Sequence, residues 1–249
     1  MRYFIHLAYN GENYHGWQNQ PNGVSVQEVI ETALGNILGS KTPITGAGRT
    51  DAGVHARNMY AHFDLETHLS NETDSLSAET LTERLNAYLP NDIVVFSIKQ
   101  VPDDMHARFS AKSRTYKYYV TTEKDPFEGM YRMRVKPSVD FKKMNEACKY
   151  LFDYEDFTSF SKLHTDVKTN NCHITEAHWG QTSPIHWEFT ITADRFLRNM
   201  VRAIVGTLLD VGSGKLTVEQ FAEVIEKKNR CVAGMSVPAK GLVLEKVEY

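Results

Sequence analysis

The chain has 249 residues, of which 41% are hydrophobic, 24% charged and 11% aromatic, and this composition excludes a collagen-like or disordered protein. No apolar run approaches the roughly 20 residues that span a bilayer, the first residues lack the features of a signal peptide, and three cysteines cannot form a paired disulfide framework. We therefore expect a cytoplasmic protein, and its formal net charge of −3 gives no overall attraction to nucleic acid.

Hydrophobic periodicity divides the first half of the chain into strands and helices. Ser25 and Glu28 have the spacing of a capping box, and Gly39 suits a helix C-terminus. The expected elements are a strand over residues 3–9, a helix over 25–39, a strand over 55–65 and a helix over 77–88.

The second half repeats the order of strand and then helix. The expected elements are a strand from residue 113, a helix over 139–154, a strand over 185–191 and a helix over 194–211. No residue-level repeat accompanies this order. The order alone predicts two α+β domains, which we place at residues 1–105 and 106–249.

The expected helix over 194–211 has a wide apolar stripe and must be buried on that side. Arg195, Arg198 and Arg202 are three and four residues apart, so on a helix they would line one edge of the stripe. They either cover the core with their aliphatic stems or face a ligand. The spacing leaves both interpretations open.

Charge is distributed unevenly along the chain. Residues 58–83 contain six acids and neither Lys nor Arg, whereas residues 106–136 contain eight basic residues and three acids. A basic face that binds nucleic acid would produce this pattern, and so would two ordinary solvated faces.

One acid lies in a glycine-rich loop, in the segment GAGRTDAGVHA over residues 46–56. Glycines at this density indicate unusual backbone dihedrals or close approach to another group. Asp51 in such a loop can be a nucleophile, a general base, a metal ligand, or a turn residue that bonds its own backbone.

This segment resembles the catalytic loop of the TruA family of tRNA pseudouridine synthases. The resemblance extends from one end of the chain to the other. Its further blocks are Tyr9-Asn10-Gly11, Gly16-Trp17-Gln18, Arg84-Leu85-Asn86, Leu89-Pro90-Asn91-Asp92-Ile93, His106-Ala107-Arg108-Phe109-Ser110-Ala111, Arg114-Thr115-Tyr116-Lys117-Tyr118, Phe196-Leu197, Met200-Val201-Arg202, Val205-Gly206, Pro238-Ala239 and Gly241-Leu242.

The resemblance implies a role for each candidate site residue. Asp51 is the expected catalytic aspartate, Arg202 its catalytic partner across a cleft, and Tyr116 the ring that stacks on the target base. Arg49 matches a position that holds the flipped-out nucleotide, and we add Arg198 as a further substrate-binding candidate. A neighbouring guanidinium would keep the Asp51 carboxylate ionised, and an aromatic ring binds a flat base without reading its edges.

The resemblance also implies a fold and a reaction. The expected fold is α+β, with two similar α/β halves whose antiparallel sheets join into one mixed sheet flanked by helices, and with a central cleft. The expected reaction converts uridine to pseudouridine at positions 38, 39 and 40 of tRNA, without cofactor or metal, in a homodimer. Asp51 could attack C1′, add to C6 or remove a C2′ proton, and the sequence does not choose among these routes.

Three segments depart from the family pattern. Met105 precedes the His-Ala-Arg-Phe block, residues 235–237 differ from the commoner run before Pro238, and residues 168–174 are atypical. We expect the first two not to affect the chemistry, whereas the third puts RNA contacts or packing in doubt.

Two other function classes and a metal site compete with this interpretation. A non-catalytic RNA-binding protein would keep the basic surface and lose the acid, and a hydrolase would release free uracil but needs a second carboxylate. A metal site is not expected, because the candidate ligands lack any recognised zinc spacing. Those ligands are His55, His62, His164, Cys172, His173 and His178.

Overall fold

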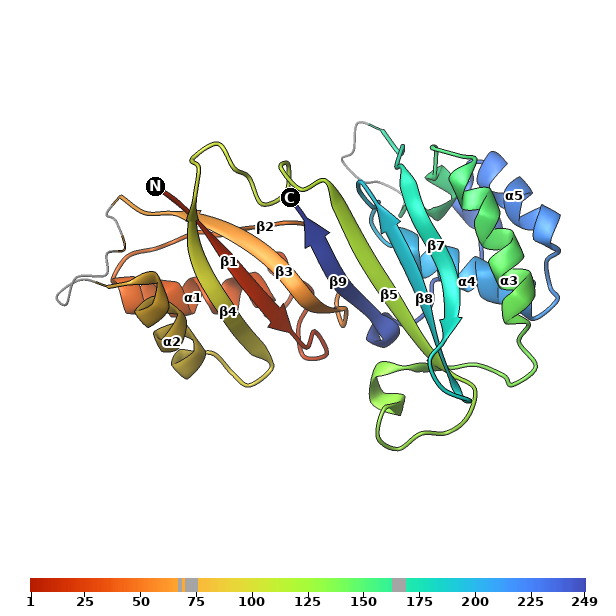
Figure 1. The fold of residues 1–249 in the computed structure, drawn as a ribbon, viewed down its shortest axis with the longest axis horizontal. Coiled ribbons are helices and arrows are strands. Elements are labelled where there is room, and N and C mark those ends of the chain that lie inside the picture. Colours follow the sequence, from red (N-terminus) through yellow and green to blue (C-terminus); the bar gives the residue numbers. More distant parts are fainter. Residues whose placement is uncertain (67–68, 70–75, 163–168) are drawn as a thin grey trace. The chain divides into compact units, whose positions relative to one another are not determined.

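The computed structural model describes residues 1–249 except 67–68, 70–75 and 163–168, and its described strands belong to one nine-stranded sheet (Figure 1). The chain forms two compact units, one made of Met1–Lys112 with Leu244–Tyr249 and the other of Ser113–Val243. Both units contain strands and helices, and the α+β prediction with one mixed sheet is confirmed. The domain boundary after residue 105 and the central cleft stay predictions. None of the described helices is long and apolar enough to cross a membrane.

The first unit is an antiparallel sheet with two helices. Its strands follow the order β4-β1-β3, and the last residues of β9 continue this order beyond β3. Asn58 of β3 donates from Nδ2 to the carbonyl oxygen of Glu245 in β9, 2.8 Å away. The elements are β1 (Arg2–Tyr9), α1 (Val26–Leu38), β2 (Thr45–Gly46), β3 (His55–Asp64), α2 (Ala78–Tyr88), β4 (Ile93–Val101) and β9 (Leu242–Glu248).

Alternation along β1 decides which face of this sheet is buried. Tyr3, Ile5 and Leu7 are at most 1% exposed and form the core together with apolar residues of α1 and α2, such as Ile30 and Leu85. The predicted caps of α1 are confirmed, because Ser25 accepts a hydrogen bond from the backbone of Glu28 and Gly39 adopts a left-handed conformation with φ 72°.

The second unit repeats the plan with different elements. Strands β5, β8 and β7 are antiparallel neighbours, and short β6 runs parallel to β5, which makes the sheet mixed. The helices α3, α4 and α5 gather together in this unit (Figure 1). The elements are β5 (Ser113–Thr121), β6 (Met133–Arg134), α3 (Phe141–Cys148), β7 (Ile174–Gln181), β8 (His186–Ala193), α4 (Met200–Gly212) and α5 (Val218–Glu226).

Two predicted helices are longer than the helices that form. The helix expected over 139–154 is α3, capped by Asp140, and it gives way to a 3₁₀ turn at Lys149–Phe152. The helix expected over 194–211 begins only at Met200, because Asn199 has a left-handed backbone with φ 67° that stops the helix from extending backwards. The predicted alignment of Arg195, Arg198 and Arg202 along one helical edge is therefore wrong.

A buried histidine gives the first unit a measurable dependence on pH. Burial, followed by the charge of Arg2 and the neighbouring His106 ring, lowers the pKa of His62 to about 4. Its Nδ1 accepts a hydrogen bond from the backbone of Ala107, 3.2 Å away. The folded state thus favours the neutral ring, and the unfolded chain binds the proton more readily.

We expect the free energy of unfolding to fall by up to about 3 kcal/mol as the pH drops from the ordinary histidine value near 6.5 to about 4. His62→Gln keeps an acceptor for Ala107 and should flatten this part of the profile. A hydrogen bond from Arg2 lowers the pKa of Asp64. The contribution of Asp64 to folding stability is therefore lost only at a lower pH, below the usual range of an aspartate. Urea unfolding of both proteins between pH 4 and 7.5 tests this, and parallel profiles would contradict it.

Candidate active site

Asp51 lies half-buried in the loop that joins β2 to β3. The backbone turns directly after it, with Val54 N donating to Asp51 O at 3.1 Å and Gly53 at φ 76°. The preceding residue, Thr50, is buried and shares a hydrogen bond of 2.9 Å between its hydroxyl and that of Tyr9. The acid thus sits on a fixed turn and not on a loose segment.

A second segment, residues 10–17, supports this loop from beside it. Trp17 N donates to Thr50 O at 3.3 Å, and Gly53 N donates to Tyr14 O at 3.3 Å. Gly16, with φ 88°, leaves no room for a side chain, since a Cβ there would lie 2.4 Å from Thr50 O. The loop that carries Asp51 is therefore bonded to the turn that follows β1.

Asp92 anchors the supporting segment in turn. The Tyr14 hydroxyl donates to Asp92 Oδ1 at 2.6 Å, and Asn10 N donates to Asp92 O at 2.8 Å. Burial and this hydrogen bond raise the pKa of Tyr14 above its usual range. Three sequence blocks that carried only a resemblance, at residues 9–11, 16–18 and 89–93, thereby acquire a physical role in holding the Asp51 loop.

Gly11→Ala tests this support. A Cβ at Gly11 would lie 2.0 Å from the carbonyl oxygen of Val54, so the supporting segment and the loop must separate. We expect a loss of about 1–3 kcal/mol in stability, typical of overpacking, and a fall in kcat/KM of about 10-fold or more from displacement of the loop. Gly35→Ala is the matched control, because a Cβ there meets only Ser40 O at 3.6 Å and a helical alanine is favourable. Wild-type melting and activity in Gly11→Ala would refute the assigned support.

Arg49 is exposed on the same loop, two residues before Asp51. The structure thus brings these two predicted site residues together in the first unit. The other three, Tyr116, Arg198 and Arg202, belong to the second unit. The pairing of Asp51 with Arg202 stays a prediction.

Tyr116 is half-buried on β5, opposite Ile191 of β8. Its ring meets that of Phe196 edge to face, with centroids 5.2 Å apart and an interplanar angle of 89°. This contact restrains the orientation of the Tyr116 ring.

Arg202 lies in the first turn of α4 and forms two hydrogen bonds with Val237 of the C-terminal segment. Its Nε donates to Val237 O at 2.8 Å, and Val237 N donates back to Arg202 O at 3.2 Å. Gly206 permits this approach, since a Cβ there would lie 1.8 Å from Met235 O. The atypical segment 235–237 therefore contacts a candidate catalytic residue through its backbone, a contact that the sequence did not suggest.

Arg198 is exposed and precedes α4, and its carbonyl oxygen accepts a hydrogen bond of 3.0 Å from Lys162 N. Close by, Asp194 Oδ1 accepts from the backbone of both His173 and Arg195 at 2.7 Å. His173 of the atypical segment is thus bonded to Asp194, shortly before α4, whereas Lys168 lies outside the described residues.

Two of the histidines considered as metal ligands, His55 and His62, have hydrogen-bond partners. His55 Nδ1 accepts a hydrogen bond from Gly11 N at 3.0 Å, as His62 Nδ1 does from Ala107 N at 3.2 Å, while His164 lies outside the described residues.

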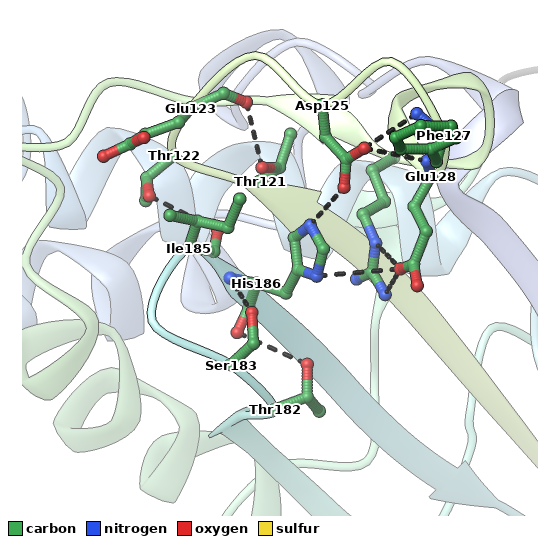
Figure 2. A network of polar contacts seen from close by, with 11 residues as sticks. Thr121, Thr122, Glu123, Asp125, Phe127, Glu128, Thr182, Ser183, Ile185 and His186 are labelled. Atoms are coloured by element: carbon green, nitrogen blue, oxygen red, sulfur yellow. Dashed lines mark hydrogen bonds and ion pairs between the residues drawn. The ribbon is translucent and has the colours of Figure 1, made fainter.

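The sequence missed a different cluster, in which ligand atoms of Asp125, Glu128 and His186 lie within 4.8 Å of one another (Figure 2). Its acids are already satisfied, because Arg132 binds Glu128 from Nε at 2.8 Å and two backbone N–H groups bind Asp125. A cation there would have to displace the guanidinium. The two acids and the histidine are some sixty residues apart in the sequence, so no local sequence pattern indicates this cluster.

Comparison with known proteins identifies the family of the chain. A family model described as tRNA pseudouridine synthase matches residues 6–110 and 147–249. The chain belongs to the tRNA pseudouridine synthase family, and it is an enzyme that isomerises uridine in tRNA.

Curated relatives support the same assignment over full length. The chain is 60% identical to tRNA pseudouridine synthase A of Bacteroides thetaiotaomicron, over 100% of this chain and 91% of that protein. It is also 60% identical to the protein of that name from Parabacteroides distasonis, over 100% of this chain and 96% of that protein. A more distant relative with the same name, from Clostridium acetobutylicum, is 41% identical over 98% and 97%.

Proposed function

We propose that this enzyme modifies uridines at positions 38, 39 and 40 in the anticodon stem-loop of tRNA, with Asp51 as the catalytic nucleophile or base. The observation that carries the proposal is the acid on a turn fixed on both sides, by Tyr9 through Thr50 and by Tyr14 through Gly53. A group that must reach a sugar or base carbon needs this kind of rigid placement.

The reaction is an isomerisation in which atoms and electrons balance internally. The N1–C1′ bond breaks, the base turns, and a C5–C1′ bond forms, while the proton on C5 is lost and N1 gains one. Asp51 serves this sequence by attack on C1′, by addition to C6 or by removal of the C2′ proton. The reaction involves no net redox change, so the chemistry itself asks for no redox cofactor.

The remaining candidates act on the substrate around the acid. Tyr116 stacks on the flipped uracil, Arg202 keeps the carboxylate ionised, and Arg49 and Arg198 bind the displaced nucleotide and its phosphates. Extrusion of the base costs a few kcal/mol, which phosphate contacts offset. We further propose a homodimer that grips one tRNA across both subunits, in the cytoplasm.

The position of modification tests this proposal. Unmodified tRNAs carrying uridine at only one of positions 38, 39 or 40 are incubated with the enzyme and treated with carbodiimide, and the blocked positions are mapped by primer extension. We expect a stop at each of the three positions and none when all three uridines are replaced. Stops elsewhere in the tRNA would refute the anticodon-arm assignment, and release of free uracil would indicate a hydrolase instead.

A further inference from the structure

The loop between β5 and β6 is held at several points in the second unit. Asp125 Oδ1 accepts hydrogen bonds from the backbone of Phe127 and Glu128 at 2.8 and 3.1 Å, and these bonds lower its pKa. His186 of β8 reaches both acids, with Nε2 2.9 Å from Asp125 Oδ2 and Nδ1 3.6 Å from Glu128 Oε2. Figure 2 shows the histidine ring between the two carboxylates.

The far end of the loop is held as well. Arg132 binds Glu128 through Nε and lies over the ring of Tyr119, with its guanidinium carbon 5.2 Å from the ring centroid. Lys240 donates from Nζ to Gly129 O at 3.3 Å. We call Asp125, Glu128, Arg132 and His186 the His186 cluster; its effect is to fix the course of the loop.

This fixed loop presents apolar side chains to solvent. Phe127 is 87% exposed, and Met130 and Tyr131 nearby are 58% and 42% exposed. Exposing large apolar side chains to water is unfavourable, and these side chains contribute nothing to the core in return. A side chain on a held backbone loses less conformational entropy on binding than one on a mobile loop, which favours an anchor residue.

The charges around Phe127 indicate its partner. Glu128 forms an ion pair with Arg132, and Asp125 Oδ2 lies 2.9 Å from His186 Nε2. Lys124, Arg134 and Lys136 are exposed, and none of them forms an ion pair with any residue that the structure describes. Residues 122–136 carry four basic residues and three acids. The loop thus offers an exposed aromatic ring in a segment with a small excess of positive charge, a combination that suits a nucleic acid strand.

We propose that Phe127 stacks on an unpaired nucleotide of the bound tRNA while Lys124, Arg134 and Lys136 contact its phosphates. The inference rests on the proposed function for its substrate and adds a second contact, separate from the target uridine. A second copy of the chain is the other conceivable occupant, but the substrate of this enzyme is tRNA, whose phosphates the exposed basic side chains of this segment can contact. The role of the His186 cluster is to hold the ring in position before RNA arrives.

Binding of unmodified tRNA to Phe127 variants tests the inference by filter binding at fixed salt. Phe127→Ala should raise the Kd about 10-fold, since stacking on one base contributes about 1–3 kcal/mol. Phe127→Trp should bind like wild type, whereas Phe127→Leu, apolar but unable to stack, should resemble alanine. Phe152→Ala removes a ring that is 47% exposed elsewhere in the same unit and should leave the Kd unchanged.

The outcomes separate this inference from the proposed function. An unchanged Kd in Phe127→Ala overturns the stacking role, whether or not the wild-type enzyme makes pseudouridine in the anticodon arm. Full binding by Phe127→Leu, together with a lower sedimentation mass for Phe127→Ala, would mean that the ring packs against a second copy. Weak binding by Ala and Leu with normal mass and normal binding by Trp supports stacking on RNA.

Discussion

Asp51→Asn is expected to lower the rate of pseudouridine formation by more than about a thousandfold, the scale seen when a catalytic group of this kind is removed. Asparagine keeps the size and the turn but cannot attack carbon or accept a proton at neutral pH. Because the change removes one negative charge beside an anionic substrate, the Kd for tRNA should stay equal or fall slightly. Single-turnover rates and filter binding measured on the same preparation check both parts.

Asp104→Asn is the matched control. Asp104 is an exposed acid of the same unit, so its replacement makes the same change in net charge away from the loop. It should leave the rate unchanged. Residual turnover of Asp51→Asn within tenfold of wild type would remove Asp51 from the catalytic role, and a large loss of binding would indicate that it only positions RNA.

Arg202→Met should lower kcat about 100-fold and change the Kd for tRNA by less than about threefold, as expected for a group that acts mainly in the transition state. Methionine preserves the aliphatic stem but loses the Nε–H that binds Val237 O and the positive charge. On the proposed pairing, Asp51 would lose the positive charge that stabilises its carboxylate as the substrate excludes water.

Arg198→Met provides the contrast within the same segment. Arg198 is exposed before α4 begins, and a phosphate contact there predicts weaker binding with kcat unchanged. The slope of log Kd against log salt should fall by about one in Arg198→Met and stay constant in Arg202→Met. A pure binding defect in Arg202→Met would reassign that residue to the RNA backbone.

The sequence predicted the elements best where local signals agree. Helix α1 has a serine cap, a helical apolar period and a terminal glycine, and it forms as expected over Val26–Leu38. Helix α4 shows the opposite case, since its apolar stripe continues back through Phe196 and Leu197 although the chain turns at Asn199. Periodicity does not reveal a single left-handed residue, and both Arg195 and Arg198 were misplaced for that reason.

Helix α5 and strand β9 are absent from the elements predicted from the sequence. Helix α5 begins with a capping box formed by Thr217 and Gln220, a pattern visible in the sequence. The last residues of strand β9 belong to the first unit, although the more than one hundred residues before them belong to the second. Local patterns cannot predict such a return, because it depends on pairing between distant segments.

The candidate site shows the same division between local and distant information. The glycine density around Asp51 predicted a constrained loop, but its cause lies in Tyr9, Gly11 and Tyr14, which are more than thirty residues earlier. The partners of Arg202 at Val237 and the His186 cluster likewise join residues far apart in the chain. The resemblance suggested the candidate site residues, and only the fold shows which residues hold them in place.

The most direct test of the central claim is tritium release from tRNA carrying 5-³H-uridine, since formation of the C5–C1′ bond expels the hydrogen at C5. We expect release by the wild-type enzyme in proportion to the pseudouridine formed, and no release by Asp51→Asn although it binds the same tRNA. Undiminished release by Asp51→Asn, or tight binding by the wild type without any release, would contradict the proposal that this protein forms pseudouridine through Asp51.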